Sequence, residues 1–180
     1  VNPKHSPNIP VILITLLVTS IISVMAQFPM GGMNGGNSAS APSFVQPQAY
    51  ESGYGWLEAE FPAMNAQFVW TPPVANNAPT VRFQYDLTIK RVVPGQEVVD
   101  AAQYGTVAFQ QRGLMTNMCM IPQNVIESLK NSGTEHFVAQ VIARPIGSNV
   151  TMTNNGESEI MLLYFKQEKE QCPTDSIDNK

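Results

Sequence analysis

The residues best suited to a soft metal lie in the segment Met115–Met120, which reads MTNMCM. Thioether and thiolate groups are the ligands that Cu(I) prefers. Alternation along a strand, however, would place Met118 and Met120 on one face and Cys119 on the other. A disulfide at Cys119 would also remove its thiolate. Core packing together with a disulfide is the preferred interpretation, so we expect no metal site and no cofactor.

Candidate catalytic groups are few. His136 is the only histidine after residue 26, and as a general base it would need Asp86 or Asp100 to orient it. No Gly-x-Ser-x-Gly elbow accompanies it. Glu58 and Glu60 would share one strand face and could mimic the carboxylate pair of a glycosidase, but a solvated face is the simpler interpretation. We expect no catalytic residues and a protein that is not an enzyme.

Four aromatic residues could form a platform for a sugar: Tyr50, Tyr54, Trp56 and Trp70. In a small β domain such residues more often cap the hydrophobic core. Core capping is therefore the first interpretation, and sugar binding is kept as an alternative.

Two further sites depend on the compartment of the protein. Cys119 and Cys172 are the two cysteines, and in an exported protein an even pair predicts one disulfide. That bond would close a long loop and contribute roughly 4 kcal/mol in the chain-entropy model. Two separate thiols or bonds between chains are the alternatives. Asn149 opens the sequon Asn-Val-Thr after a turn-like stretch, and is the predicted glycan acceptor.

The N-terminal segment predicts the compartment. Residues 10–25 are apolar and uncharged, with Lys4 and His5 before them, and the run is shorter than the roughly 20 residues of a transmembrane helix. The pattern ending at Ala26 is one that signal peptidase reads, with cleavage before Gln27. We expect a signal peptide over 1–26 and a secreted, extracellular protein. An uncleaved anchor and a core helix are the alternatives, although no polar face supports the latter.

Charge restricts the partners. The full chain carries a net charge of −4, and residues 1–26 hold one of the 10 basic residues and none of the acidic ones. The mature chain is therefore slightly more acidic still. This balance argues against nucleic acid, which demands clustered Lys and Arg, and against anionic membrane. The expected partners are other extracellular matrix proteins or polysaccharide, with self-association as a further option.

Composition divides the chain into segments. Residues 27–50 are rich in Gly, Met, Ser and Pro, without a charged residue before Glu51, which predicts a flexible tail. A single β-rich domain is expected over 51–172, and a loose C-terminal tail over 173–180.

Periodicity indicates a mainly β fold. Apolar and polar residues alternate strictly over 81–90, which predicts a strand with one dry and one wet face. Asn124 and Glu127 have the spacing of a capping box for one short α-helix at about 124–132, and Asn155-Gly156 is typical of a hairpin turn. The expected architecture is an antiparallel β-sandwich or a bent sheet. The remaining strands are expected over residues 57–61, 68–70, 97–102, 105–111, 114–121, 137–144, 150–153 and 157–165.

One stretch resembles a known family. Val99-Asp100 would enter a strand that ends in Thr106-Val-Ala-Phe109, followed by Cys119-Met-Ile-Pro122 and a helix. This order is similar to that of BRICHOS domains. The resemblance implies that Asp100 is the family's strand aspartate, that Cys119 and Cys172 are its disulfide pair, and that the domain shields aggregation-prone strands.

We therefore expect a secreted, non-catalytic protein that is a structural or interaction component of an extracellular matrix. The order of signal, glycine-rich tail and domain resembles that of matrix proteins of mineralised tissue such as shell, an analogy of composition. A BRICHOS-like chaperone module and a small secreted domain for a carbohydrate or hydrophobic ligand are the alternative hypotheses.

Overall fold

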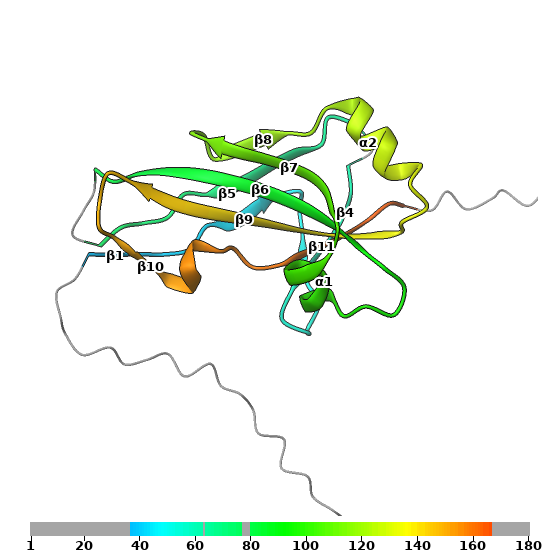
Figure 1. The fold of residues 1–180 in the computed structure, drawn as a ribbon, viewed down its shortest axis with the longest axis horizontal. Helices are drawn as coiled ribbons and strands as arrows, with labels where there is room; N and C mark the ends of the chain where they lie inside the picture. The colour runs from blue at the N-terminus through cyan, green and yellow to red at the C-terminus, as the bar shows by residue number, and fades with distance from the viewer. Residues whose placement is uncertain (1–36, 63, 77–79, 167–180) are drawn as a thin grey trace, which may run out of the picture. The chain divides into compact units, whose positions relative to one another are not determined.

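The strictly alternating segment forms a long strand of the largest sheet, β6 (Arg82–Val92) (Figure 1). In the computed structural model, which describes residues 37–62, 64–76 and 80–166, β6 pairs antiparallel with β9 (His136–Ile146) on one side. On its other side it pairs antiparallel with β7 (Val107–Leu114). The alternate residues Phe83, Tyr85, Leu87 and Ile89 are buried, as the pattern predicts.

β6, β7 and β9 belong to a six-stranded sheet with the order β3-β4-β11-β9-β6-β7. The other members are β3 (Tyr50–Glu51), β4 (Leu57–Glu60) and β11 (Met161–Tyr164). β4 and β11 run parallel, whereas the remaining pairs are antiparallel. The sheet is therefore mixed.

A smaller antiparallel sheet packs on the inner face of the large one. It contains β2 (Ser43–Gln46), β5 (Gln67–Thr71) and β8 (Met118–Met120). Trp70 of β5 contacts Tyr85 of β6, with 5.4 Å between ring centroids. Phe61 makes edge-to-face contacts with Phe68 and Phe137. The aromatic core thus lies between two sheets, and the expected mainly β fold is confirmed.

Two helices lie on different sides of the large sheet. α2 (Gln123–Lys130) buries Ile126 and Leu129 in the main core, and it confirms the short helix expected at about 124–132. α1 (Val98–Tyr104) buries Ala101 and Ala102 against Val138 on the outer face of the sheet. A parallel pair, β1 (Ser38–Ala39) with β10 (Thr151–Met152), and the short 3-10 segment η1 (Thr153–Gly156) complete the described part.

The helix α1 corrects the expectation of a strand over 97–102. Val98 and Val99 favour a strand by propensity, but tertiary contacts decide otherwise. The Lys90 ammonium donates hydrogen bonds to the carbonyls of Ala102 and Gln103, the latter at 2.9 Å. These carbonyls would otherwise lack partners at the C-terminal end of the helix.

The predicted hairpin around Asn155-Gly156 is also wrong. β10 pairs with β1, and β11 pairs with β4 and β9, so the two segments do not pair with each other. Asn154 and Asn155 both have positive φ. After this turn the chain runs antiparallel beside β9, where Glu157 bridges to Ile142 and the Ser158 amide donates to the Val141 carbonyl at 2.8 Å.

Two smaller expectations are corrected. Pro122 is the N-cap of α2 and no side chain caps the helix, so the capping box of Asn124 and Glu127 is not formed. The strand expected over 114–121 is limited to β8.

The expectation of a flexible tail over 27–50 is wrong for residues 37–50, the part of it that the structure describes. β1, β2 and the start of β3 lie within it, and Ala39 and Pro42 are buried. These small side chains fit between larger neighbours in the core, which composition alone does not reveal. All described residues belong to one compact unit. Residues 27–36 and the C-terminal tail at 173–180 lie outside the described residues.

Candidate functional site: a cationic groove on the sheet

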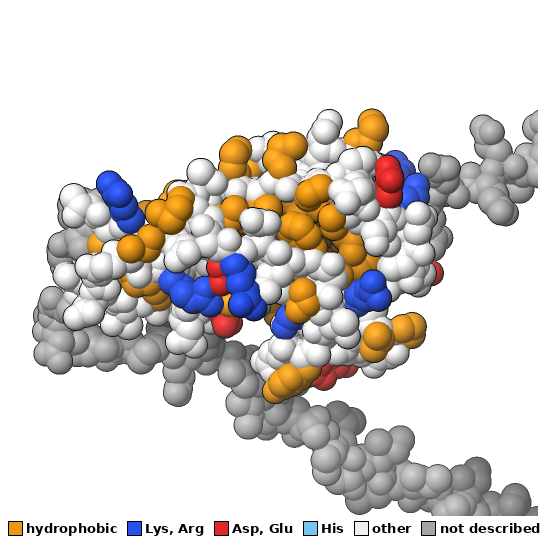
Figure 2. Space-filling view, turned by 45° about the horizontal axis from the view of Figure 1, so that its top comes forward, with side chains coloured by type: hydrophobic (Ala, Val, Ile, Leu, Met, Phe, Trp, Pro, Cys, Tyr) orange, Lys and Arg blue, Asp and Glu red, His pale blue; other side chains and the backbone are white. Residues whose placement is uncertain are grey.

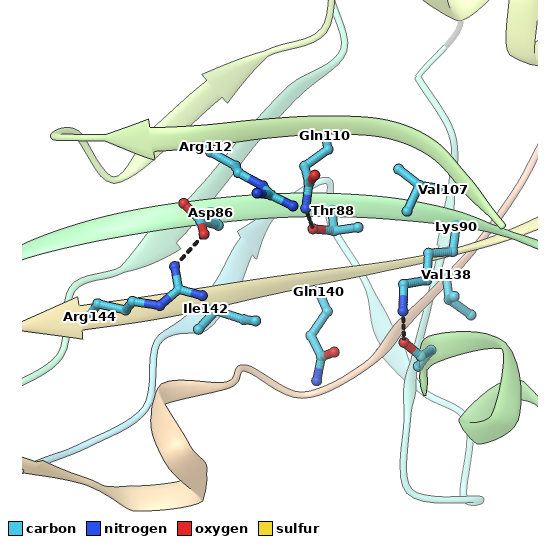
Figure 3. A pocket seen from close by; sticks show the side chains of 11 residues that line it. Asp86, Thr88, Lys90, Val107, Gln110, Arg112, Val138, Gln140, Ile142 and Arg144 are labelled. Atoms are coloured by element: carbon cyan, nitrogen blue, oxygen red, sulfur yellow. Dashed lines mark hydrogen bonds and ion pairs between the residues drawn. The ribbon is translucent and has the colours of Figure 1, made fainter. Parts of the chain in front are cut away.

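The outer face of β6, β7 and β9 is hollowed into a groove of about 560 Å³, which we call the cationic groove (Figure 3). This volume falls within the range of small-ligand sites. The side chains opposite the core point into it because successive residues of a strand face opposite sides. Its polar lining consists of Asp86, Thr88, Lys90, Gln110, Arg112, Gln140 and Arg144.

An ion pair at one end of the groove joins Asp86 of β6 to Arg144 of β9. Asp86 lies opposite Ile142 in the ladder, so Arg144 is its diagonal neighbour on the same face. The Asp86 side chain is buried, whereas 56% of the Arg144 side-chain surface is exposed. Arg144 therefore still presents part of its guanidinium to a ligand.

A β-bulge in β7 brings the backbone to Asp86. The register shifts between Tyr85 and Leu87, so that Arg112 and Gly113 together oppose Asp86. Gly113 has a φ of 74°, a conformation that glycine adopts without strain, and its amide donates to Asp86 Oδ1 at 2.9 Å. The bulge thereby places Arg112 beside Asp86.

Asp86 is held in its charged form. Burial alone would raise its pKa, but the hydrogen bonds from Arg144 and the Gly113 amide, with the charges of Arg144 and Arg112, outweigh burial and lower the pKa. A carboxyl with a lowered pKa is a poor proton donor or acceptor near neutral pH. Asp86 is thus suited to fixing cations in place.

The other end of the groove carries Lys90, whose ammonium bridges to the carbonyls at the end of α1. Between the two ends, the Gln110 side-chain amide donates to Thr88 Oγ1 at 3.0 Å. The side chain of Arg112 reaches into the same space (Figure 3). The Arg112 side chain makes no hydrogen bond or ion pair with the described residues.

The groove is positive although the chain is acidic. Lys90, Arg112 and Arg144 outnumber Asp86, the one acidic residue of its lining, while the full chain has a net charge of −4. On this face basic side chains lie together with acidic ones beside a hollow (Figure 2). Glu157 and Glu159 line a neighbouring hollow that shares Lys90 with the groove. An anionic group would therefore bind at the Arg112 and Arg144 end.

A second hollow, of about 790 Å³, lies between the β2–β3 connection and the loop before β4, and we call it the aromatic groove. Trp56 lines it, and Tyr54 stacks on Trp56 with 5.4 Å between ring centroids. Trp70, by contrast, is fully buried in the core. The Tyr50 hydroxyl lies 3.4 Å from that of Tyr164 and donates to Glu58 at 3.0 Å. The four aromatics thus do not form one platform: Tyr54 and Trp56 lie together, whereas Trp70 is in the core and Tyr50 contacts Tyr164 and Glu58.

The sequence-predicted sites are found at separate places. Asn149 is exposed just after the bend that follows β9, as a glycan acceptor must be. Cys119 is buried in β8, while its predicted disulfide partner Cys172 lies outside the described residues, so the bond stays a prediction. The cleavage site between Ala26 and Gln27 also lies outside them.

Asp100 does not occupy the position that the family resemblance implies. It is exposed on α1, whereas the resemblance implies a strand. The BRICHOS resemblance itself stays a prediction. His136 is exposed at the start of β9. Met118 and Met120 do alternate with Cys119, but they face outward, so the expectation of core packing is wrong for them.

The part of the chain that the structure describes holds no group of three or more His, Cys, Asp or Glu side chains placed to bind a metal ion. Neither described helix is long and apolar enough to cross a bilayer. Comparison with protein-family models, with curated proteins and with solved structures found no match.

The sequence pattern could locate part of the cationic groove. Asp86, Thr88 and Lys90 follow from the alternation of β6, which places them on the wet face. Arg112 and Arg144 could not be assigned to the same face, because a bulge and a long-range register bring them there.

Proposed function

We propose that this chain is a secreted, non-catalytic protein that acts by association in an extracellular matrix, where the cationic groove binds anionic groups of a polysaccharide. The observation that carries the proposal is the gathering of Lys90, Arg112 and Arg144 in one groove of an acidic chain. The three cations stand on paired strands, a rigid support for a binding site.

The chemistry of the groove favours an oxyanion. A guanidinium offers N–H donors in a planar fork that matches carboxylate and sulfate. Arg112 has this fork available, and Arg144 keeps over half of its side-chain surface exposed beside it. Carboxylate and sulfate are the anionic groups of acidic polysaccharides. The cationic groove, at about 560 Å³, has room for a short stretch of such a chain.

The sequence supports the proposed extracellular location. Residues 1–26 have the pattern of a cleaved signal. The sequon asparagine, Asn149, is exposed at a bend. Both features belong to a protein that passes through the export pathway.

The experiment is a titration of the purified chain by calorimetry at low salt with heparin, hyaluronan and uncharged dextran. We expect binding to heparin or hyaluronan that weakens as salt is added, and no binding to dextran. A preference between the first two distinguishes sulfate from carboxylate. Binding to dextran alone, or to none of the three, would contradict the proposal.

Two variants test the groove itself. Arg112→Gln should weaken binding about tenfold, equivalent to about 1.4 kcal/mol, because it removes the available guanidinium. Arg82→Gln is the matched control, since Arg82 is exposed on β6 but does not line the groove. Equal losses in both variants would show that only net charge attracts the polymer.

A further inference from the structure

The aromatic groove has the features of a second binding site, with a charge opposite to that of the cationic groove. Its charged lining consists of Glu51 and Glu159. Its volume of about 790 Å³ is again that of a small-ligand site. A ligand that fits here must carry no negative charge, which excludes the acidic polymers proposed for the other groove.

One carboxylate is fixed in position. Glu159 Oε1 accepts hydrogen bonds from the Ser43 hydroxyl and the Phe44 amide, both at 2.8 Å. Its other oxygen accepts no hydrogen bond from the described residues. Glu51 and Gln48 are exposed on the same lining. The groove therefore presents more acceptors than donors, an arrangement that suits a ligand with several hydroxyl groups.

The aromatic side supplies a flat apolar surface. The rings of Tyr54 and Trp56 are stacked with an interplanar angle of 21°, and Tyr54 is 77% exposed. Phe44 and Leu57 extend the apolar lining. A pyranose ring has one face of C–H groups, which packs on an aromatic ring, and a rim of hydroxyls, which reach polar groups.

We propose that the aromatic groove binds an oligosaccharide without negative charge. Its ring packs on the Tyr54–Trp56 pair, and its hydroxyls donate to Glu159 and Glu51. This site is independent of the cationic groove, because it uses other residues and the opposite charge.

The structure suggests a fluorescence test, because the chain has two tryptophans, Trp56 and Trp70. Trp56 lines the groove, whereas Trp70 is 0% exposed in the core. Titration of the purified chain with chitohexaose or cellohexaose should change the emission saturably with at least one of them. The emission of Trp56→Phe, which reports Trp70, should stay constant. No saturable change with either oligosaccharide would overturn the proposal.

Calorimetry with matched variants distinguishes a specific site from nonspecific association with exposed aromatic side chains. Tyr54→Ala should weaken oligosaccharide binding about tenfold, equivalent to about 1.4 kcal/mol, because it removes the exposed ring of the stacked pair. Tyr104→Ala should leave it unchanged, because Tyr104 is similarly exposed, at 80%, but lies on α1 and does not stack on Trp56, the tryptophan that lines the groove. Arg112→Gln should also leave it unchanged. Equal losses in the Tyr54 and Tyr104 variants would contradict the proposal.

Discussion

At the scale of single residues, Asp86 organises the cationic groove. Asp86 is 8% exposed, although it belongs to the polar set of an alternating strand. The bulge and Arg144 cover it and satisfy its oxygens. Alternation could place Asp86 on the outer face, but the sequence carries no sign of its burial, because both partners come from distant segments.

Replacing Asp86 tests this role. Asp86→Asn should lower the free energy of unfolding by about 1–2 kcal/mol at pH 7, since it removes a charge-assisted hydrogen bond. The loss stays below that of a fully buried pair, because the exposed part of Arg144 regains water. Glu60→Gln, at an exposed carboxylate on β4, is the control and should change little. Urea unfolding measures both.

The pH dependence of the same pair has a defined sign. The pKa of Asp86 is lower in the folded chain, so its contribution is fully present above the ordinary aspartate pKa of about 3.9. It is lost as the pH falls through the lowered folded value. The difference between wild type and Asp86→Asn should therefore shrink in acid. A difference that stays constant down to low pH would contradict the ion pair.

At the scale of elements, periodic strands could be predicted and their partners could not. β6 and β9 follow from their own patterns, whereas α1 depends on Lys90, which lies on another element. The Asn155-Gly156 pair predicts a hairpin turn because that dipeptide favours one. In the fold, the same residues lead into a segment that lies antiparallel beside β9, an arrangement decided by long-range packing.

Gly156 provides the test at this scale. It is buried with a φ of 79°, and a Cβ would lie 2.2 Å from the Ala143 carbonyl oxygen. Gly156→Ala should therefore destabilise the fold by about 3 kcal/mol or more, through strain and a backbone clash. Gly95→Ala is the matched control, since Gly95 has a φ of 81° with nothing within 4 Å of its Cβ. It should cost about 1–2 kcal/mol.

Thermal or urea unfolding of the two glycine variants gives the comparison. We expect a clearly larger loss of stability for Gly156→Ala than for Gly95→Ala. Equal losses would mean that Gly156 does not pack against the Ala143 carbonyl of β9.

At the scale of the whole molecule, the distribution of charge carries more information than the net charge. The chain is acidic, yet it presents one groove with a positive lining and another with a negative one. Composition averages the two, so acidity alone could not predict a site for anionic groups. The parallel pairing of β4 with β11 likewise joins segments that lie about a hundred residues apart, which local patterns do not encode.

The central claim is that the protein acts by association in an extracellular matrix, and localisation tests it most directly. Mass spectrometry of the source tissue would compare body fluid with the washed insoluble matrix. We predict recovery from the insoluble fraction, release by high salt, and an N-terminal peptide that begins at Gln27. Recovery from body fluid alone would contradict the account.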